Sequence, residues 1–355
     1  MTKILSWNQR IDQLADAHPD KPAIIFIPVA GEHRRISWRE LDKNSNRIAR
    51  WMAARGISAD SRVAIGLFNS PEHYFVAIAA WKLGALVLPL AGNAPARERK
   101  SMLDVFCPSL VIAGWGNTDW TTFSAAEMMS ESASCDSSKL PDVIPHPGKA
   151  IGSGGSSGQP KVIVYPHPWA FDLKRLPPGS PDLGMRPEQV YMVAGPLYFN
   201  SAFTVSNRAL FADNTLVVLG RFDPAKVVDA IEHYRVENFF LAPIHMKRVV
   251  ELPGVAERDF SSVESMFHTG GPCAQWLKRA WMKLIPPAKV LEAYGTTEGN
   301  GITTVRGDEW MDRPGTVGRP QGCDMRILDD TGQDVATGEI GEIFMRSHAV
   351  GLTFQ

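Results

Sequence analysis

The stretch AIGSGGSSGQPKVIVYPH, residues 150–167, contains only Gly and Ser from position 152 to position 158, and Lys161 follows just before a β-branched run. In such a loop the backbone amides, the hydroxyl groups and one ammonium group can all turn toward an anion, and successive amides form a cradle that suits phosphate oxygens. Two interpretations are open at this point. The stretch is either a flexible surface turn, which Gly–Ser richness alone favours, or a phosphate-binding loop.

The spacing excludes two familiar phosphate motifs. A Walker loop needs Lys and then Ser or Thr directly after its second Gly, whereas Gln159 and Pro160 follow Gly158. A dinucleotide fingerprint that starts at Gly152 needs Gly at position 157, which is Ser157. Any phosphate chemistry here must therefore follow a third pattern.

Composition sets the general class of the protein. The 355 residues are 44% hydrophobic and carry a formal net charge of −1, which fits a globular protein of two or three subdomains and gives no general attraction to nucleic acid. No long apolar run or apolar signal core is present, so we expect no membrane span and a cytoplasmic location. The four cysteines are scattered without a C-x-x-C pair, which predicts reduced thiols rather than disulfides or a zinc site.

Apolar strands alternate with helical segments in two runs of the chain. In the first run Ser37 and Glu40 form a capping box at the start of a helix, and in the second Asp223 caps a helix that has Pro224 in its first turn. Strands that are apolar throughout and separated by helices belong to parallel sheets covered on both faces. The pattern predicts an α/β fold of two helix-flanked, mostly parallel sheets packed together.

Two segments depart from this alternation. Residues 116–149 are rich in Ser and Pro and predict a surface connection with little regular structure. From about residue 315, short alternating strands predict hairpins and a small β-barrel-like C-terminal part. We therefore expect three subdomains, namely about 1–170 (α/β with the Gly–Ser loop), 171–314 (α/β) and 315–355 (β).

Two motifs together carry a family resemblance. The stretch SGGSSGQPK, residues 153–161, resembles the phosphate loop of adenylate-forming enzymes, which include acyl- and aryl-CoA ligases, peptide-synthetase adenylation domains and luciferases. Its one departure is Gly154, where the family usually has a hydroxyl residue. The stretch EAYGTTEG, residues 292–299, matches the Y-G-x-T-E motif of that family at the end of a predicted strand. The joint match, rather than either motif alone, identifies the chain as a member.

Further similarity extends over essentially the whole chain. HTGGPC (268–273), GTVGRP (315–320) and TGEIGEIFMRS (337–347) each resemble family segments. The resemblance implies that residues 1–355 are the large N-terminal domain of an acyl-CoA ligase. The family normally continues with a T-G-D segment and a mobile C-terminal domain. Neither is in this sequence, so we expect an isolated N-terminal domain.

The resemblance also implies a nucleotide site. Tyr294 would offer a face for adenine, Thr297 a hydroxyl for the α-phosphate region, and Glu298 a hard carboxylate ligand for Mg²⁺. Thr297, Glu298 and Lys161 are the expected catalytic residues. The expected nucleotide-binding residues are Ser153, Gly155, Ser156, Ser157, Gly158, Lys161, Gly270, Gly271, Glu292, Ala293, Tyr294, Gly295, Thr296 and Thr297.

An acyl pocket is expected around the stretch GPLYFNSAF, residues 195–203. Phe199 stands where the family often has His, and it either gates the pocket or packs in the core. His245 either lines the pocket or is a surface or capping group. The expected pocket residues are Phe199, Asn200, His245, Gly270 and Gly271.

The function that the resemblance implies is ATP-dependent ligation of a carboxylic acid to coenzyme A, with ATP, Mg²⁺ and coenzyme A as cofactors. Sequence context favours a fatty, steroid-type or aryl acid as the substrate. Two alternatives stay open: an adenylation domain that loads a carrier protein, and a binding module for ATP or acyl-AMP with little turnover. A homodimer is also left open.

Overall fold

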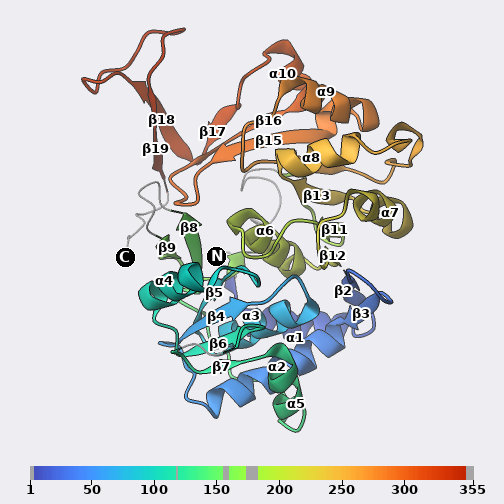
Figure 1. Ribbon diagram of the computed structural model, residues 1–355, viewed down its shortest axis with the longest axis vertical. Helices are drawn as coiled ribbons and strands as arrows, with labels where there is room; N and C mark the ends of the chain where they lie inside the picture. Colours follow the sequence, from blue (N-terminus) through green and yellow to red (C-terminus); the bar gives the residue numbers. More distant parts are fainter. Residues whose placement is uncertain (1–3, 117–118, 155–159, 173–182, 349–355) are drawn as a thin grey trace.

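The computed structural model describes residues 4–116, 119–154, 160–172 and 183–348, and Figure 1 shows two sheets stacked with helices around and between them. The predicted α/β class with two helix-flanked, mostly parallel sheets is confirmed. The segments not described include most of the Gly–Ser loop and both ends of the chain.

One sheet has six strands in the described chain, in the order β7-β6-β4-β5-β8-β9. All neighbouring strands are parallel except the last pair, β8 and β9, which forms an antiparallel hairpin. Its strands are β4 (Arg62–Gly66), β5 (Leu86–Pro89), β6 (Leu110–Ala113), β7 (Thr122–Phe123), β8 (Lys149–Gly154) and β9 (Pro160–Tyr165).

The other sheet has nine strands within the described ranges, in the order β17-β16-β15-β14-β13-β11-β12-β2-β3. The six strands from β15 to β2 are parallel, and antiparallel strands close both edges. Its strands are β2 (Pro22–Ile27), β3 (Arg34–Ser37), β11 (Val190–Val193), β12 (Thr215–Leu219), β13 (Asn238–Leu241), β14 (Ser265–His268), β15 (Val290–Gly295), β16 (Ile302–Arg306) and β17 (Arg319–Gln321).

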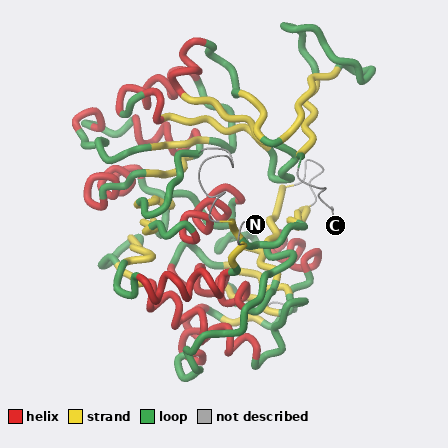
Figure 2. The backbone as a smooth tube through the Cα atoms, turned by 180° about the vertical axis from the view of Figure 1, so that it is seen from behind, coloured by secondary structure: helices red, strands yellow, loops and turns green. Residues whose placement is uncertain are grey.

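Helices fill the space between the sheets and cover their outer faces (Figures 1 and 2). Apolar residues of α1 (Trp7–Ala17), α2 (Trp38–Ala53), α3 (Pro71–Lys82) and α6 (Asn200–Phe211) form one core with both sheets. Two further cores lie on the outer faces, one under α7 (Pro224–Tyr234), α8 (Pro243–Val250) and α9 (Gln275–Leu284), the other under α4 (Ala96–Phe106). Smaller elements are α5 (Ala125–Ser132), α10 (Gly307–Asp312), the 3₁₀ turns Val255–Glu257 and Pro287–Lys289, and the short pair β1 (Ile4–Leu5) and β10 (Phe171–Asp172).

Aromatic packing joins the helices of the central layer. The ring of Trp7 in α1 stacks on that of Trp81 in α3 with centroids 4.7 Å apart, and Trp81 also contacts Phe203 of α6. Trp7, Trp81 and Phe203 are all fully buried. Large buried aromatic rings contribute much of the hydrophobic stabilisation, so α6 is firmly placed between the sheets.

Local sequence signals explain where several helices begin. The predicted capping box of Ser37 and Glu40 is present at α2, and the Asp223 side chain accepts hydrogen bonds from the first turn of α7, as expected. The prediction of little regular structure for residues 116–149 is wrong for α5, which begins with a second capping box, formed by Ser124 and Glu127. The Ser-rich composition hid this S-x-x-E pattern, which supplies partners for the free amides of the first turn.

The segment after residue 322 forms a hairpin that extends away from the two sheets (Figure 2). Strands β18 (Cys323–Leu328) and β19 (Glu342–Ser347) pair antiparallel, which confirms the predicted hairpin character. In the described residues they form a two-stranded sheet only, so the expected barrel-like closure is not found there. Closure needs more strands than this hairpin supplies. The subdomain boundaries stay a prediction. Strands β2 and β3, from residues 22–37 of the first predicted subdomain, pair within the nine-stranded sheet, whose other strands come from later in the chain.

Candidate functional site

Strands β8 and β9 carry the two ends of the predicted phosphate loop. They are in register, with Ser153 opposite Lys161 and Lys149 opposite Tyr165. Ser153 is half-buried and Lys161 is exposed. The hairpin therefore holds the loop ends side by side. The predicted loop residues Gly155, Ser156, Ser157 and Gly158 lie outside the described residues.

Strand β15 carries the first part of the second motif. Glu292 and Ala293 lie within the strand, between β14 and β16, and Glu292 accepts an ion-pair contact from the buried Lys278 of α9. The strand ends at Gly295, where a Cβ atom would lie only 2.8 Å from the carbonyl oxygen of Gly301. This close approach of two backbones requires glycine.

The end of β15 and the turn after it present the side chains expected to meet the nucleotide. Tyr294 and Thr296 are exposed, whereas Thr297 and Glu298 are half-buried. The Glu298 carboxylate makes no hydrogen bond or ion pair within the described chain, so its oxygens are available to a cation. Because Mg²⁺ is usually held by one or two carboxylates together with substrate phosphates, Glu298 fits such an ion.

Tyr165 connects the two motifs. Its hydroxyl donates a hydrogen bond to the main-chain carbonyl of Thr297, and its ring lies under the ammonium group of Lys149, which also contacts Asn200 of α6. Burial raises the pKa of Tyr165 to about 12, so the hydroxyl stays protonated and can act as a donor. The strand after the phosphate loop, helix α6 and the turn after β15 therefore meet at one point.

Lys149, which our sequence analysis did not single out, lies beside this point. Its side chain is buried, and its ammonium nitrogen lies 3.0 Å from Asn200 Oδ1, 2.7 Å from Thr204 Oγ1 and 3.4 Å from the ring centroid of Tyr165. Burial lowers the pKa of Lys149 well below its usual value. The sequence offered one signal for this residue: Lys149 is the first residue of strand β8, and strands of a covered parallel sheet are buried.

The structure separates the two interpretations of Phe199. Phe199 is the residue before α6, its side chain is 53% exposed, and its ring lies 4.4 Å from that of Tyr198. Core packing is therefore wrong for Phe199, and the gate role stays a prediction. Asn200 begins the helix and is held by Lys149 and Thr204.

His245 lies near the start of α8. Its ring stacks on that of Phe222 with centroids 4.1 Å apart. Burial and the nearby Arg248 lower the pKa of His245. In the described ranges no hydrogen bond or ion pair joins His245 to another expected site residue, so its place in the acyl pocket stays a prediction.

Gly270 and Gly271 follow strand β14. A Cβ atom at either glycine would meet no other atom within 4 Å, so the space in front of them is open to a ligand. Gly270 has a φ of 84°, which favours glycine. His268, the last residue of β14, is fully buried without a hydrogen-bond partner for either ring nitrogen, and burial together with Lys278 lowers its pKa to about 3.

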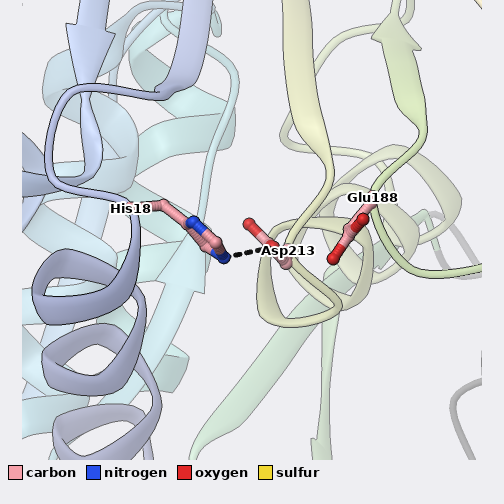
Figure 3. A group of neighbouring side chains, drawn as sticks. All are labelled: His18, Glu188 and Asp213. Carbon is pink, nitrogen blue, oxygen red and sulfur yellow. Dashed lines mark ion pairs between the residues drawn. The ribbon is translucent and has the colours of Figure 1, made fainter.

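A separate group of side chains, His18, Glu188 and Asp213, comes together far from these motifs in the sequence (Figure 3). His18 Nε2 lies 3.7 Å from Asp213 Oδ2, and Lys21 Nζ lies 2.8 Å from Asp213 Oδ1. Because Lys21 already neutralises the buried Asp213 carboxylate, the group needs no metal ion for charge balance, and we assign none to it.

A cavity of about 760 Å³ lies beside strand β16 and helix α10, and its lining includes Thr304, Arg306 and Glu309. Among the expected site residues that the structure describes, none lines it. Its described walls carry both acidic and basic side chains and no described residue of the two motifs. The chemistry of the motifs, rather than this cavity, therefore locates the candidate site.

Two stacked helix-flanked sheets and the junction of the two motifs define the N-terminal domain of an adenylate-forming enzyme. The chain belongs to the AMP-binding enzyme family, whose sequence profile matches residues 11–354.

Proteins with similar sequences include both peptide synthetases and acyl–CoA ligases. The chain is 26% identical to a probable non-canonical nonribosomal peptide synthetase, CymA, of Salinispora arenicola over 94% of its own length and 4% of that protein. It is 24% identical to the putative acyl–CoA ligase YdaB of Bacillus subtilis over 90% of its length and 67% of that protein. The chain thus spans about two thirds of this ligase and a small part of the synthetase.

The fold matches that of O-succinylbenzoate coenzyme A synthetase (MenE) of Bacillus subtilis in complex with AMP. The TM-score is 0.81 at 21% identity, and the match covers 99% of this chain and 89% of that chain. Among the described helices, none combines the length and apolar character that a membrane crossing requires.

Proposed function

We propose that the protein is the nucleotide- and acyl-binding domain of an ATP-dependent carboxylate–CoA ligase. The observation that carries this proposal is the contact of Tyr165 with the Thr297 carbonyl. It brings the strand after the predicted phosphate loop to the turn that bears Glu298. A nucleotide held by both would have its phosphates between Lys161 and the Glu298 carboxylate.

The proposed reaction has two steps. A carboxylate oxygen of the acid forms a bond to the α-phosphorus of ATP, and the bond from that phosphorus to the bridging oxygen breaks, which releases pyrophosphate. A thiol sulfur then bonds to the acyl carbon, its proton goes to solvent, and AMP leaves.

The barrier of the first step is electrostatic because two anions meet. Glu298 would hold Mg²⁺, which neutralises phosphate charge when bound, and the Thr297 hydroxyl would contact the α-phosphate region. Lys161 and the amides of the predicted loop would donate to the phosphate oxygens, and loss of one such preorganised donor typically raises a barrier by about 3 kcal/mol.

The acid is proposed to be a fatty, steroid-type or aryl acid. The segment around Phe199 and Asn200 contains no carboxylate that could hold the ammonium group of an amino acid. The basic side chain next to Asn200 is Lys149, which offers no counter-charge to an ammonium group either. The lack of a carboxylate in this segment disfavours an amino acid as the substrate.

Transfer to a carrier protein is the second candidate function, because the similar proteins include a peptide synthetase as well as an acyl–CoA ligase. The third candidate is a module that binds ATP or acyl-AMP with little turnover. Both share the adenylate site with the first candidate and differ from it in the fate of the acyl-adenylate.

The test is a thermal-shift panel of non-hydrolysable acyl-adenylate analogues with short, long-chain, aryl and steroid-like acyl groups, beside ATP–Mg²⁺. A ligand that binds only the folded chain stabilises it by about 2.7 kcal/mol at one hundred times its Kd, so the best-fitting acyl group gives the largest shift. The absence of a shift with every adenylate and with ATP–Mg²⁺ would contradict the proposal.

Turnover measurements separate the three candidates. Carboxylate-dependent release of pyrophosphate excludes the pure binding module. Release of AMP that requires coenzyme A supports the ligase, whereas an acyl-adenylate that coenzyme A does not consume but a carrier protein does supports the second candidate.

A further inference from the structure

A buried lysine without a carboxylate partner lies directly behind the candidate site. Lys149 is 2% exposed, and within the described residues no carboxylate oxygen lies within ion-pair distance of its ammonium group. Its polar contacts are the side-chain oxygens of Asn200 and Thr204, and its ammonium group also lies over the ring of Tyr165. Burying an ammonium group with only neutral partners costs free energy. Stabilisation of the fold therefore does not explain why a lysine occupies this position.

The hydrogen bonds around Lys149 have a defined direction. Lys149 donates to Asn200 Oδ1, and the hydroxyl of Thr204 lies 2.9 Å from the same oxygen as a second donor. An amide oxygen that accepts from two donors fixes which end of the amide is its oxygen, so Lys149 and Thr204 set the orientation of Asn200. The same Lys149 nitrogen lies 3.4 Å from the ring centroid of Tyr165, and the Tyr165 hydroxyl donates to the carbonyl of Thr297.

The hydrogen bond from Tyr165 fixes the backbone next to Glu298. The carbonyl of Thr297 belongs to the peptide unit that precedes Glu298, so a donor on that oxygen sets the plane of the peptide and the direction in which the Glu298 side chain leaves the chain. A misplacement of about 1 Å in a site of this kind is enough to impair binding and catalysis.

We propose that Tyr165, whose ring packs under the Lys149 side chain, is a positioning residue that holds the Thr297–Glu298 turn in the geometry for binding nucleotide with Mg²⁺. This inference rests on the proposed function. It adds to that function an internal polar cluster that extends from strand β8 to the turn after β15 and consists of four side chains, Lys149, Asn200, Thr204 and Tyr165.

The test compares Tyr165→Phe with Tyr191→Phe. The first variant removes only the hydroxyl and keeps the ring beneath the Lys149 ammonium group. The second removes the hydroxyl of another buried tyrosine, in β11, that is not part of the cluster. The Kd of ATP–Mg²⁺ and of AMP without Mg²⁺ is measured by calorimetry for each variant, together with the unfolding temperature.

We expect Tyr165→Phe to raise the Kd of ATP–Mg²⁺ about tenfold, the equivalent of one well-placed hydrogen bond, and to raise that of AMP less because AMP needs no metal ligand. Tyr191→Phe should leave both values within about twofold of the parent. The variant Lys149→Met should act in the same direction as Tyr165→Phe, and Lys149→Arg, which keeps the donors, should recover part of the affinity. If Lys149→Met does not fold, the two tyrosine variants decide the matter.

Two results would overturn the inference while the proposed function stands: ATP–Mg²⁺ binding by Tyr165→Phe within about twofold of the parent, or an equal loss of binding in Tyr191→Phe. Failure of the parent chain to bind ATP–Mg²⁺ and every acyl-adenylate would instead reject the proposed function, and the inference with it. The parent measurement therefore distinguishes the two failures.

Discussion

Lys278 and Glu292 form an ion pair that is almost removed from solvent, with side-chain exposures of 3% and 14%. Lys278 Nζ also lies 4.3 Å from the ring centroid of Trp310. The pair joins helix α9 to strand β15 two residues before Tyr294. It therefore anchors the strand from which the nucleotide-binding turn begins.

Breaking this pair should destabilise the fold strongly. Lys278→Met or Glu292→Gln leaves one charge buried without its partner, which typically costs about 3–5 kcal/mol. In the double variant Lys278→Met/Glu292→Gln no charge is left unpaired, so the decrease in its free energy of unfolding should be smaller than the sum of the two single decreases. Urea unfolding measures all three, and Asp324→Asn, at an exposed pair with Arg346, is the control expected to change stability by less than about 1 kcal/mol. Strict additivity of the two single changes would show that the charges do not interact.

The carboxylate of Glu298 should matter for the metal-bound nucleotide and not for the fold. Because it has no partner within the described chain, Glu298→Gln should leave the unfolding temperature nearly unchanged. It should weaken ATP binding in the presence of Mg²⁺ by at least about tenfold, since even residues that only orient metal ligands contribute 10- to 100-fold. Calorimetric titration of ATP with and without Mg²⁺ measures this, with the exposed Glu257→Gln as control. Equal Mg²⁺ dependence in the Glu298 and Glu257 variants would remove Glu298 from the site.

The stability of the fold should fall as the pH drops below about 6.5. Burial lowers the pKa of both His73 and His268 to about 3, so between that value and the ordinary value of 6.5 the unfolded chain binds more protons than the folded one. Stability then rises with pH across this window and is complete above it, with each histidine adding up to about 1.4 kcal/mol per pH unit. Asp12, whose pKa is raised to about 6 by burial and by Asp42, acts in the opposite direction between its ordinary value and that pH and offsets part of the effect.

Urea unfolding at a series of pH values tests this dependence. His73→Phe should flatten the slope between pH 4 and 6, because Phe cannot bind the proton and suits the aromatic surroundings that include Phe203. The exposed His233→Gln is the control that should leave the slope unchanged. A parent chain equally stable at pH 4 and pH 7 would contradict the assignment.

Sequence patterns foresaw those parts of the molecule that local chemistry specifies. The capping residue Ser37 and the apolar strands could be recognised from a few consecutive residues, because helix caps and buried strands depend on residues close in the sequence. The capping box at Ser124 has the same local signal and was missed only because Ser-rich surroundings suggested a loop. Pairing of β2 with β12 joins positions about 190 apart, and no local pattern encodes such a partner.

The candidate site divides in the same way. The two motifs contain Lys161 and Glu298 as recognisable residue types, and the sequence was sufficient to name them. Lys149 and Tyr165 join the two motifs, and this role could not be predicted from the sequence. Their partners are distant in the sequence and lie on α6 and in the turn after β15. A lysine at a strand start shows in the sequence, but its burial follows from tertiary packing.

Phe199 offers a last prediction, on the choice of the acid. Its side chain is 53% exposed, so Phe199→Ala should change the free energy of unfolding by less than about 0.5 kcal/mol, whereas a core phenylalanine would cost about 3–5 kcal/mol. If the ring borders the acyl pocket, its loss should shift the relative affinities for short-chain and bulky acyl-adenylate analogues, because a change of pocket size by one methylene is worth about 1–3 kcal/mol. The control is Phe344→Ala, which removes a similarly exposed ring from the β18–β19 hairpin. An unchanged order of affinities in Phe199→Ala would place the acyl group elsewhere and leave Phe199 as a surface residue.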